Sequence, residues 1–271
     1  MNNSIKHSGI IFLLSAVLAV LIIFTSLTGI FTPDFYSKEK VNWQIQSNGQ
    51  DIIDLLILAP ALLVTSIFAF RGSRIAGILR GGIFLYAGYT FAIFCFNIHF
   101  NKLFILYCFE FGLSFYLLMH FLFSLFKREH SEQLSNEIIY KVTGIYFVMI
   151  SLIFFLLWMS EILPSVINDS TPQILIETGL FTNPVHVLDL SVFLPGIFMT
   201  GVFLLRRNAT AGYLAPAILV FFVLMDITIA FLIVLMENER TQLNFPLIII
   251  MSFLALFSLG ILIRLLKKVQ T

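Results

Sequence analysis

The chain has 271 residues, of which 59% are hydrophobic and only 11% are charged, and its mean hydropathy is +0.98. A soluble domain carries about 25% charged residues, whereas several runs here approach the ~20 apolar residues that cross a bilayer. This composition excludes an ordinary soluble domain, and the net charge of +1 argues against a nucleic-acid-binding protein. We therefore predict an all-α multi-pass membrane protein whose main partner is the lipid bilayer.

The first predicted helix, 10–31, follows a polar stretch at 1–9. Its apolar run is longer than the about 7–15 residues of a signal-peptide core, and no A-x-A cleavage site follows it, so we interpret it as an uncleaved span. The polar segment 32–50 is predicted to be a loop. A second long connection is predicted at 161–186, with a short surface element at 174–181.

Eight transmembrane helices are predicted in all. They cover about 10–31, 51–70, 81–97, 103–126, 142–160, 187–205, 212–236 and 245–264. The polar stretch 127–141 is the expected boundary between a first half, 1–135, and a second half, 136–271, within a single membrane domain.

The basic residues indicate the orientation of the chain. With both termini cytoplasmic, only four of the 16 Lys and Arg residues face outward, namely Lys38, Lys40, Lys102 and Arg240. Short cytoplasmic loops carry an excess of Lys and Arg, so this distribution predicts a plasma-membrane (inner-membrane) protein with both termini inside.

A stretch from Asp54 to Gly77 returns without gaps from Asp189 to Gly212. Asp54, Pro60, Thr65, Arg71 and Gly77 match Asp189, Pro195, Thr200, Arg206 and Gly212. Matches of these residue types in one register predict a duplicated unit. Each repeat has an even number of spans, four, so the second repeat begins on the same side of the membrane as the first. The two tandem four-helix repeats are therefore expected to share one orientation and to be related by an axis along the membrane normal.

The repeated helices carry the first candidate site. Pro60 and Pro195 each remove a backbone donor at matching depth and predict a kink. Uniform helical spacing places two matching sets of residues on one face of each helix: Asp54, Ala61, Thr65 and Phe68, and Asp189, Gly196, Thr200 and Phe203. The small residues Ala61 and Gly196 are predicted to let another helix approach closely. Broken helices at the interface between repeats are where transporters build binding sites.

A structural interpretation of the two aspartates stays open beside this one. In the first turn of a helix, Asp54 and Asp189 would accept hydrogen bonds from free backbone N–H groups as caps.

Glu110 and Asp226 are predicted to lie deep in their spans. A charge at the bilayer centre costs about 2.5–3.5 kcal/mol on insertion scales, so such residues usually line a cavity or have a partner. The duplicate positions are Phe245 and Phe91, which are not acidic. Both a binding role and a packed, hydrogen-bonded role are compatible with the sequence.

Asn97 and His99 lie in a polar turn at the predicted outer face and are further candidates for binding. No spacing of Cys and His suits a metal, and no phosphate-loop, dinucleotide or hydrolase motif occurs, so neither a metal nor a cofactor is expected. Cys95 and Cys108 are interpreted as two buried thiols, although a disulfide between them is geometrically conceivable.

Several stretches resemble an uncharacterised family of bacterial multi-pass integral membrane proteins. They are GQDIIDLLILAPALL, RGSRIAG, FNKLFILY, NPVHVLDLSVFLPG and GYLAPAILVF. The resemblance implies an integral plasma-membrane protein and brings no activity, ligand or catalytic residue with it.

The leading functional hypothesis is a small-solute or ion translocator with its site between helices 51–70 and 187–205. The alternative is a sensor or assembly partner that binds a membrane protein through 32–50 and 161–186. A membrane-embedded enzyme that modifies lipids is the third interpretation, and no catalytic residue is assigned for it.

Overall fold

The computed structural model describes residues 2–126, 134, 137–238 and 245–270, and all regular structure among them is helical. In chain order the elements are α1 (Asn2–Phe31), α2 (Val41–Ile53), the π-helix η1 (Asp54–Leu58), α3 (Ala59–Phe70), α4 (Arg74–Asn97), α5 (Phe104–Phe126), α6 (Ile138–Ile167), α7 (Gln173–Thr178), α8 (Pro184–Leu188), the π-helix η2 (Asp189–Phe193), α9 (Leu194–Leu205), α10 (Ala209–Asn238) and α11 (Phe245–Gln270). Most of the predicted boundary at 127–141, and Arg240, lie outside the described residues.

Eight helical spans in the described part of the chain are long and apolar enough to cross a membrane. The second span is the continuous run α2–η1–α3 and the sixth is α8–η2–α9, while α7 is the short element predicted between the fifth and sixth spans. For the described residues, the prediction of an all-helical chain with eight helices able to cross a membrane is confirmed.

The second span begins at Val41, well before the predicted start at 51. The segment is polar, but one side of it faces the protein: Trp43, Ser47 and Asp51 are all buried. A hydropathy pattern therefore mistakes this part of the helix for a loop, because the buried side of α2 carries hydroxyl and carboxyl groups.

Each of the two matched spans is interrupted by a π-turn directly before its proline. The N–H of Ala59 donates to the carbonyl oxygen of Asp54, and the N–H of Leu194 donates to that of Asp189, both five residues back. A proline has no N–H and its ring clashes with the carbonyl four residues earlier, so one wide turn accommodates it. The predicted break in each helix takes this form.

The π-turn also changes which residues share a face. It inserts one residue into the helical repeat, so the face predicted from uniform spacing does not form. Asp54 is 1% exposed, whereas Phe68 is 51% exposed. Gly196, predicted as a point of close helix approach, has no atom within 4 Å of an added Cβ.

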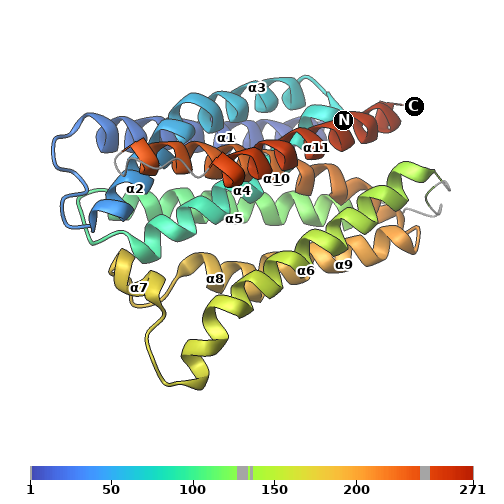
Figure 1. Ribbon diagram of the computed structural model, residues 1–271. Helices are drawn as coiled ribbons and strands as arrows, with labels where there is room; N and C mark the ends of the chain where they lie inside the picture. Colours follow the sequence, from blue (N-terminus) through green and yellow to red (C-terminus); the bar gives the residue numbers. More distant parts are fainter. Residues whose placement is uncertain (1, 127–133, 135–136, 239–244, 271) are drawn as a thin grey trace.

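Helices α4 and α10 pack against each other in the middle of the bundle (Figure 1). A Cβ added to Gly82 would meet the carbonyl oxygen of Ala217, so the two backbones touch there. A second close approach joins α6 and α9, where a Cβ on Gly144 would lie 2.9 Å from the oxygen of Gly201. Small residues allow such contacts between membrane helices.

Both chain termini lie at one end of the bundle, which we call the terminal end, and α7 lies at the opposite, α7 end (Figure 1). Helix α6 packs along α9 and diverges from the remaining helices toward the α7 end. The divergence of α6 positions the cavity described next.

Candidate binding cavity

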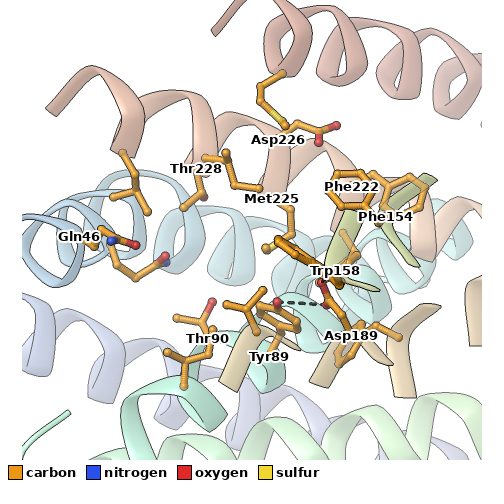
Figure 2. A pocket seen from close by; sticks show the side chains of 18 of the residues that line it. Gln46, Tyr89, Thr90, Phe154, Trp158, Asp189, Phe222, Met225, Asp226 and Thr228 are labelled. Carbon is orange, nitrogen blue, oxygen red and sulfur yellow. Dashed lines mark hydrogen bonds between the residues drawn. The ribbon is translucent and has the colours of Figure 1, made fainter. Parts of the chain in front are cut away.

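A cavity of about 500 Å³ lies between α2, α4, α6, α9, α10 and α11. Its walls are mostly apolar and aromatic, with a few polar groups that converge on it (Figure 2). This size and composition are those of sites that hold a small molecule.

Asp189 is held at the cavity wall by donors from two other helices. Trp158 Nε1 of α6 donates to Asp189 Oδ2 over 2.9 Å, and the hydroxyl of Tyr89 on α4 donates to Asp189 Oδ1 over 3.2 Å (Figure 2). The carboxylate thus links α4, α6 and η2 through side chains, and the cap interpretation does not describe it.

Asp226 of α10 lines the same cavity and is only 8% exposed. Its Oδ2 is buried and has no hydrogen-bond partner within the described part of the chain. A buried polar atom without a partner costs free energy comparable to its full desolvation, so such atoms in native proteins call for an explanation. A donor on a bound ligand would provide the missing bond.

The charge of the lining has one sign. Glu161, Asp189 and Asp226 are its acidic residues, and no Lys or Arg is among the lining residues that the structure describes. The lining is therefore acidic among the residues that the structure describes.

Asp54 does not line the cavity, but it bonds a residue that does. Gln50, which lines the cavity, donates from Nε2 to Asp54 Oδ1 and to the hydroxyl of Tyr86, each over 2.9 Å. The Tyr86 hydroxyl in turn is 2.6 Å from that of Thr228, another lining residue. Asp54 lies inside a continuous helix and bonds a side chain, so the cap interpretation fails here too.

An aromatic cluster lies at the end of the cavity lining nearest the terminal end. On α6 the lining residue nearest that end is Tyr146, whose hydroxyl is 2.8 Å from that of Ser258. The ring of Tyr146 packs 5.0 Å from Phe257 and 5.8 Å from Phe222, and Phe147 packs 5.5 Å from Phe222. These rings form a floor, and the lining extends from it toward the α7 end.

The other residues predicted from sequence lie away from the cavity lining. Glu110 is 0% exposed, and its Oε1 accepts a 2.7 Å hydrogen bond from Thr25. Its Oε2, like Asp54 Oδ2, is buried without a partner among the described residues. The hydroxyls of Thr65 and Thr200 bond back to the carbonyls of Ala61 and Gly196 in their own helices.

The polar turn after α4 is a docking contact between loops. His99 Nδ1 is 2.8 Å from Glu39 Oε2, and its backbone N–H donates to Glu39 Oε1 over 2.7 Å. Asn97 Nδ2 donates to the carbonyl of Thr182 over 3.4 Å. These contacts tie the connection after α1, and the one before α8, to the end of α4.

Two further predictions concern metals and thiols. Within the described part of the chain, no three His, Cys, Asp or Glu side chains gather closely enough to hold a metal ion. Cys95 and Cys108 are both free thiols, and Cys108 is exposed rather than buried.

Tyr36, in the connection after α1, has its hydroxyl buried 2.7 Å from Asp51 Oδ2. Burial, and after it the neighbouring Asp51 carboxylate, raises the pKa of Tyr36 well above its usual value. The hydroxyl therefore keeps its proton and acts as a donor.

Sequence reasoning missed the partners of Asp189. Tyr89 and Trp158 are distant from it in sequence, and neither shows a local motif. The matching positions of Asp54 and Asp189 in the repeated stretch were the one sequence pattern that pointed to this site. They identified Asp189, which lines the cavity, and Asp54, which bonds the lining residue Gln50.

The spans and the cavity define a multi-pass membrane protein with a small-molecule-sized site in its interior. In comparisons with known proteins, no family model matches the chain, and no curated protein or solved structure is significantly similar to it.

Proposed function

We propose that the protein is a translocator for a small, mostly apolar organic cation, which binds in the cavity between α4, α6, α9, α10 and α11. The observation that carries this proposal is an apolar cavity of about 500 Å³ whose lining includes Asp189 and Asp226 and no Lys or Arg among the described residues. Intramembrane carboxylates usually line a substrate or ion path.

The chemistry of the walls matches such a ligand. Asp226 offers an unpartnered oxygen to an ammonium or amide donor, while the Trp158 and Phe222 rings offer an apolar and cation-attracting surface. Asp189 keeps two donors and serves to hold the wall.

Two tandem halves, 1–135 and 136–271, are part of the proposal. Matching local geometry supports them. Ser73 and Asn208 each cap the helix that follows by accepting the N–H three residues on, from Ala76 and Ala211. The residues just before them, Gly72 and Arg207, both have positive φ, 93° and 60°.

The floor residues Tyr146, Phe222 and Ser258 all belong to the second half, on α6, α10 and α11. Movement of α6 away from α10 and α11 would therefore open the floor and expose the site to the terminal end. With the termini cytoplasmic in the plasma membrane, the present conformation faces outward.

Cysteine accessibility tests the proposal. Cys95 and Cys108 would be replaced by Ser, and single cysteines placed at the lining residues Met225 and Ile229. Leu219, which is fully buried on the same helix, provides the control. The probe is a membrane-impermeant thiol reagent applied from each side of vesicles.

Labelling of both lining positions from both sides, with Leu219 unlabelled, is the expected result. Labelling from one side alone under all conditions would contradict translocation and favour a receptor or a lipid-modifying enzyme. No labelling from either side would contradict a water-accessible site.

A second candidate function is an assembly partner that docks at the α7 end. Lys40 Nζ donates to the carbonyl of Ile176 over 2.6 Å, which joins the segments 32–50 and 161–186 into one surface. Phe181 on this surface is fully exposed. Loss of a stably co-purifying protein on Phe181→Ser, with the cavity labelling unchanged, would favour this function.

A further inference from the structure

A second cavity, of about 270 Å³, lies at the terminal end of the bundle, between the end of α3, the start of α4, the end of α5 and the start of α10. Its polar lining residues are Ser73, Arg74, Arg80, His120, Ser124 and Tyr213. No Asp or Glu is among the described residues that line it. The cavity is therefore basic, in contrast to the acidic cavity near Asp189.

Arg80 is the charged group deepest along α4 in this lining. Its Nε is buried and has no hydrogen-bond partner among the residues that the structure describes, and its guanidinium lies 5.7 Å from the centre of the Phe84 ring. Burial of a cation without a carboxylate partner is costly. The stacking on Phe84 orients the guanidinium, but it leaves the Nε donor unused.

The cavity combines basic groups with an apolar wall. Ile78, Phe84, Phe121 and Leu125 supply that wall from α4 and α5. Gly77 also lines the cavity, and a Cβ added there would meet no atom within 4 Å, so space is open beside the first turns of α4.

We infer that this cavity binds a phosphate group, with Arg80 as its principal ligand and Arg74 at its exposed mouth. A guanidinium fork matches phosphate oxygens with two parallel hydrogen bonds. Basic pockets between membrane helices at a cytoplasmic surface bind the head groups of anionic lipids. The phosphate belongs either to an anionic phospholipid or to a soluble phosphorylated compound. This inference does not depend on the proposed translocation.

The test compares the purified protein with Arg80→Gln, Arg80→Lys and Arg71→Gln. Arg71 is exposed at the same end of the bundle but does not line the cavity, so Arg71→Gln controls for general charge. Thermal stability in a neutral detergent is measured with added phosphatidylglycerol and, separately, with inorganic phosphate. Native mass spectrometry counts the phosphatidylglycerol that each variant retains.

A lipid site predicts that phosphatidylglycerol raises the Tm of the wild type and of Arg71→Gln by several degrees. Arg80→Gln is expected to lose that shift and to retain at least threefold less lipid, with Arg80→Lys intermediate. A soluble phosphate site predicts the same loss for inorganic phosphate instead. Equal shifts and equal retention in the wild type and Arg80→Gln would overturn the inference.

If Arg80→Gln does not fold, Ser124→Leu takes its place. Ser124 is exposed at the mouth of the cavity, so a leucine there blocks entry while Arg80 remains. Blocked entry must abolish the Tm shift, and a full shift in Ser124→Leu would overturn the inference as well.

Discussion

The region α1–α5 and the region α6–α11 use the same backbone device and fill the space beside it differently. Each carries an aspartate at the start of a π-turn that precedes a proline. Beside Asp54 the space is filled by hydrogen-bonded side chains, whereas beside Asp189 it stays open as the 500 Å³ cavity.

The region α1–α5, which we call the filled region, contains polar pairs buried among apolar residues. Tyr36 donates to Asp51 and Thr25 donates to Glu110, each over 2.7 Å. Gly29 makes this arrangement possible, since a Cβ there would collide with the Asp51 carboxylate and lie 2.9 Å from the Tyr36 hydroxyl. The first region is therefore organised for packing.

In the region α6–α11, which we call the open region, the carboxylates of Asp189 and Asp226 lie at the wall of the cavity. Asp54, Glu110 and Asp226 each have one oxygen without a partner among the described residues, but only that of Asp226 belongs to a residue lining the cavity. The divergence of α6 keeps this cavity from being filled by a neighbouring helix. The π-turn with its aspartate is thus common to both regions. The side chains around it determine whether the adjacent space is packed, as beside Asp54, or open, as beside Asp189.

The largest expected effect is the disruption of the filled region by Gly29→Leu. Overpacking a tight core costs about 1–3 kcal/mol or more, and here a buried hydrogen bond is displaced as well. We expect a Tm lower by roughly 10 °C or failure to fold. Gly260→Leu is the matched control, because no atom lies within 4 Å of its added Cβ. Equal stability of the two variants would contradict the packing described for Gly29.

An intermediate loss of stability is expected from removal of Glu110, the deep carboxylate of the filled region, and a smaller one or none from removal of Asp226 in the open region. Glu110→Ala leaves a hole in a packed region and removes the hydrogen bond from Thr25 to Oε1, although it also removes the unpartnered Oε2. It is expected to lower the free energy of unfolding by about 2–3 kcal/mol. Asp226→Ala removes an unpartnered oxygen beside a cavity and is expected to leave stability unchanged or to raise it. Denaturation followed by circular dichroism measures both. A larger loss for Asp226→Ala than for Glu110→Ala would reverse the assignment of the two regions.

The smallest effect is expected from the wall of the open region. Trp158→Phe removes the hydrogen bond to Asp189 and is expected to cost about 1–2 kcal/mol. Trp43→Phe is the control, because Trp43 lines the same cavity but its Nε1 is buried without a partner. Thermal unfolding of the two variants side by side measures the difference, and a loss at Trp43 as large as at Trp158 would exclude a role for that bond.

The spans were predictable because long apolar runs follow directly from the cost of exposing backbone polar groups to lipid. The break before Pro60 and Pro195 was predictable from the chemistry of proline. The start of α2 at Val41 was not, because Ser47 and Asp51 are polar yet buried. Nor was the cavity, since the contacts of Asp189 with Tyr89 and Trp158 depend on tertiary packing that no local pattern encodes.

The position of the two tryptophans has a spectroscopic consequence. Trp43 and Trp158 are the only tryptophans in the sequence, and both line the same cavity from different helices. The intrinsic indole emission of the protein therefore originates entirely at the walls of this one space. Entry of water shifts that emission to longer wavelength and entry of an apolar molecule shifts it to shorter wavelength, so the unlabelled protein carries its own optical reporter of what occupies its interior.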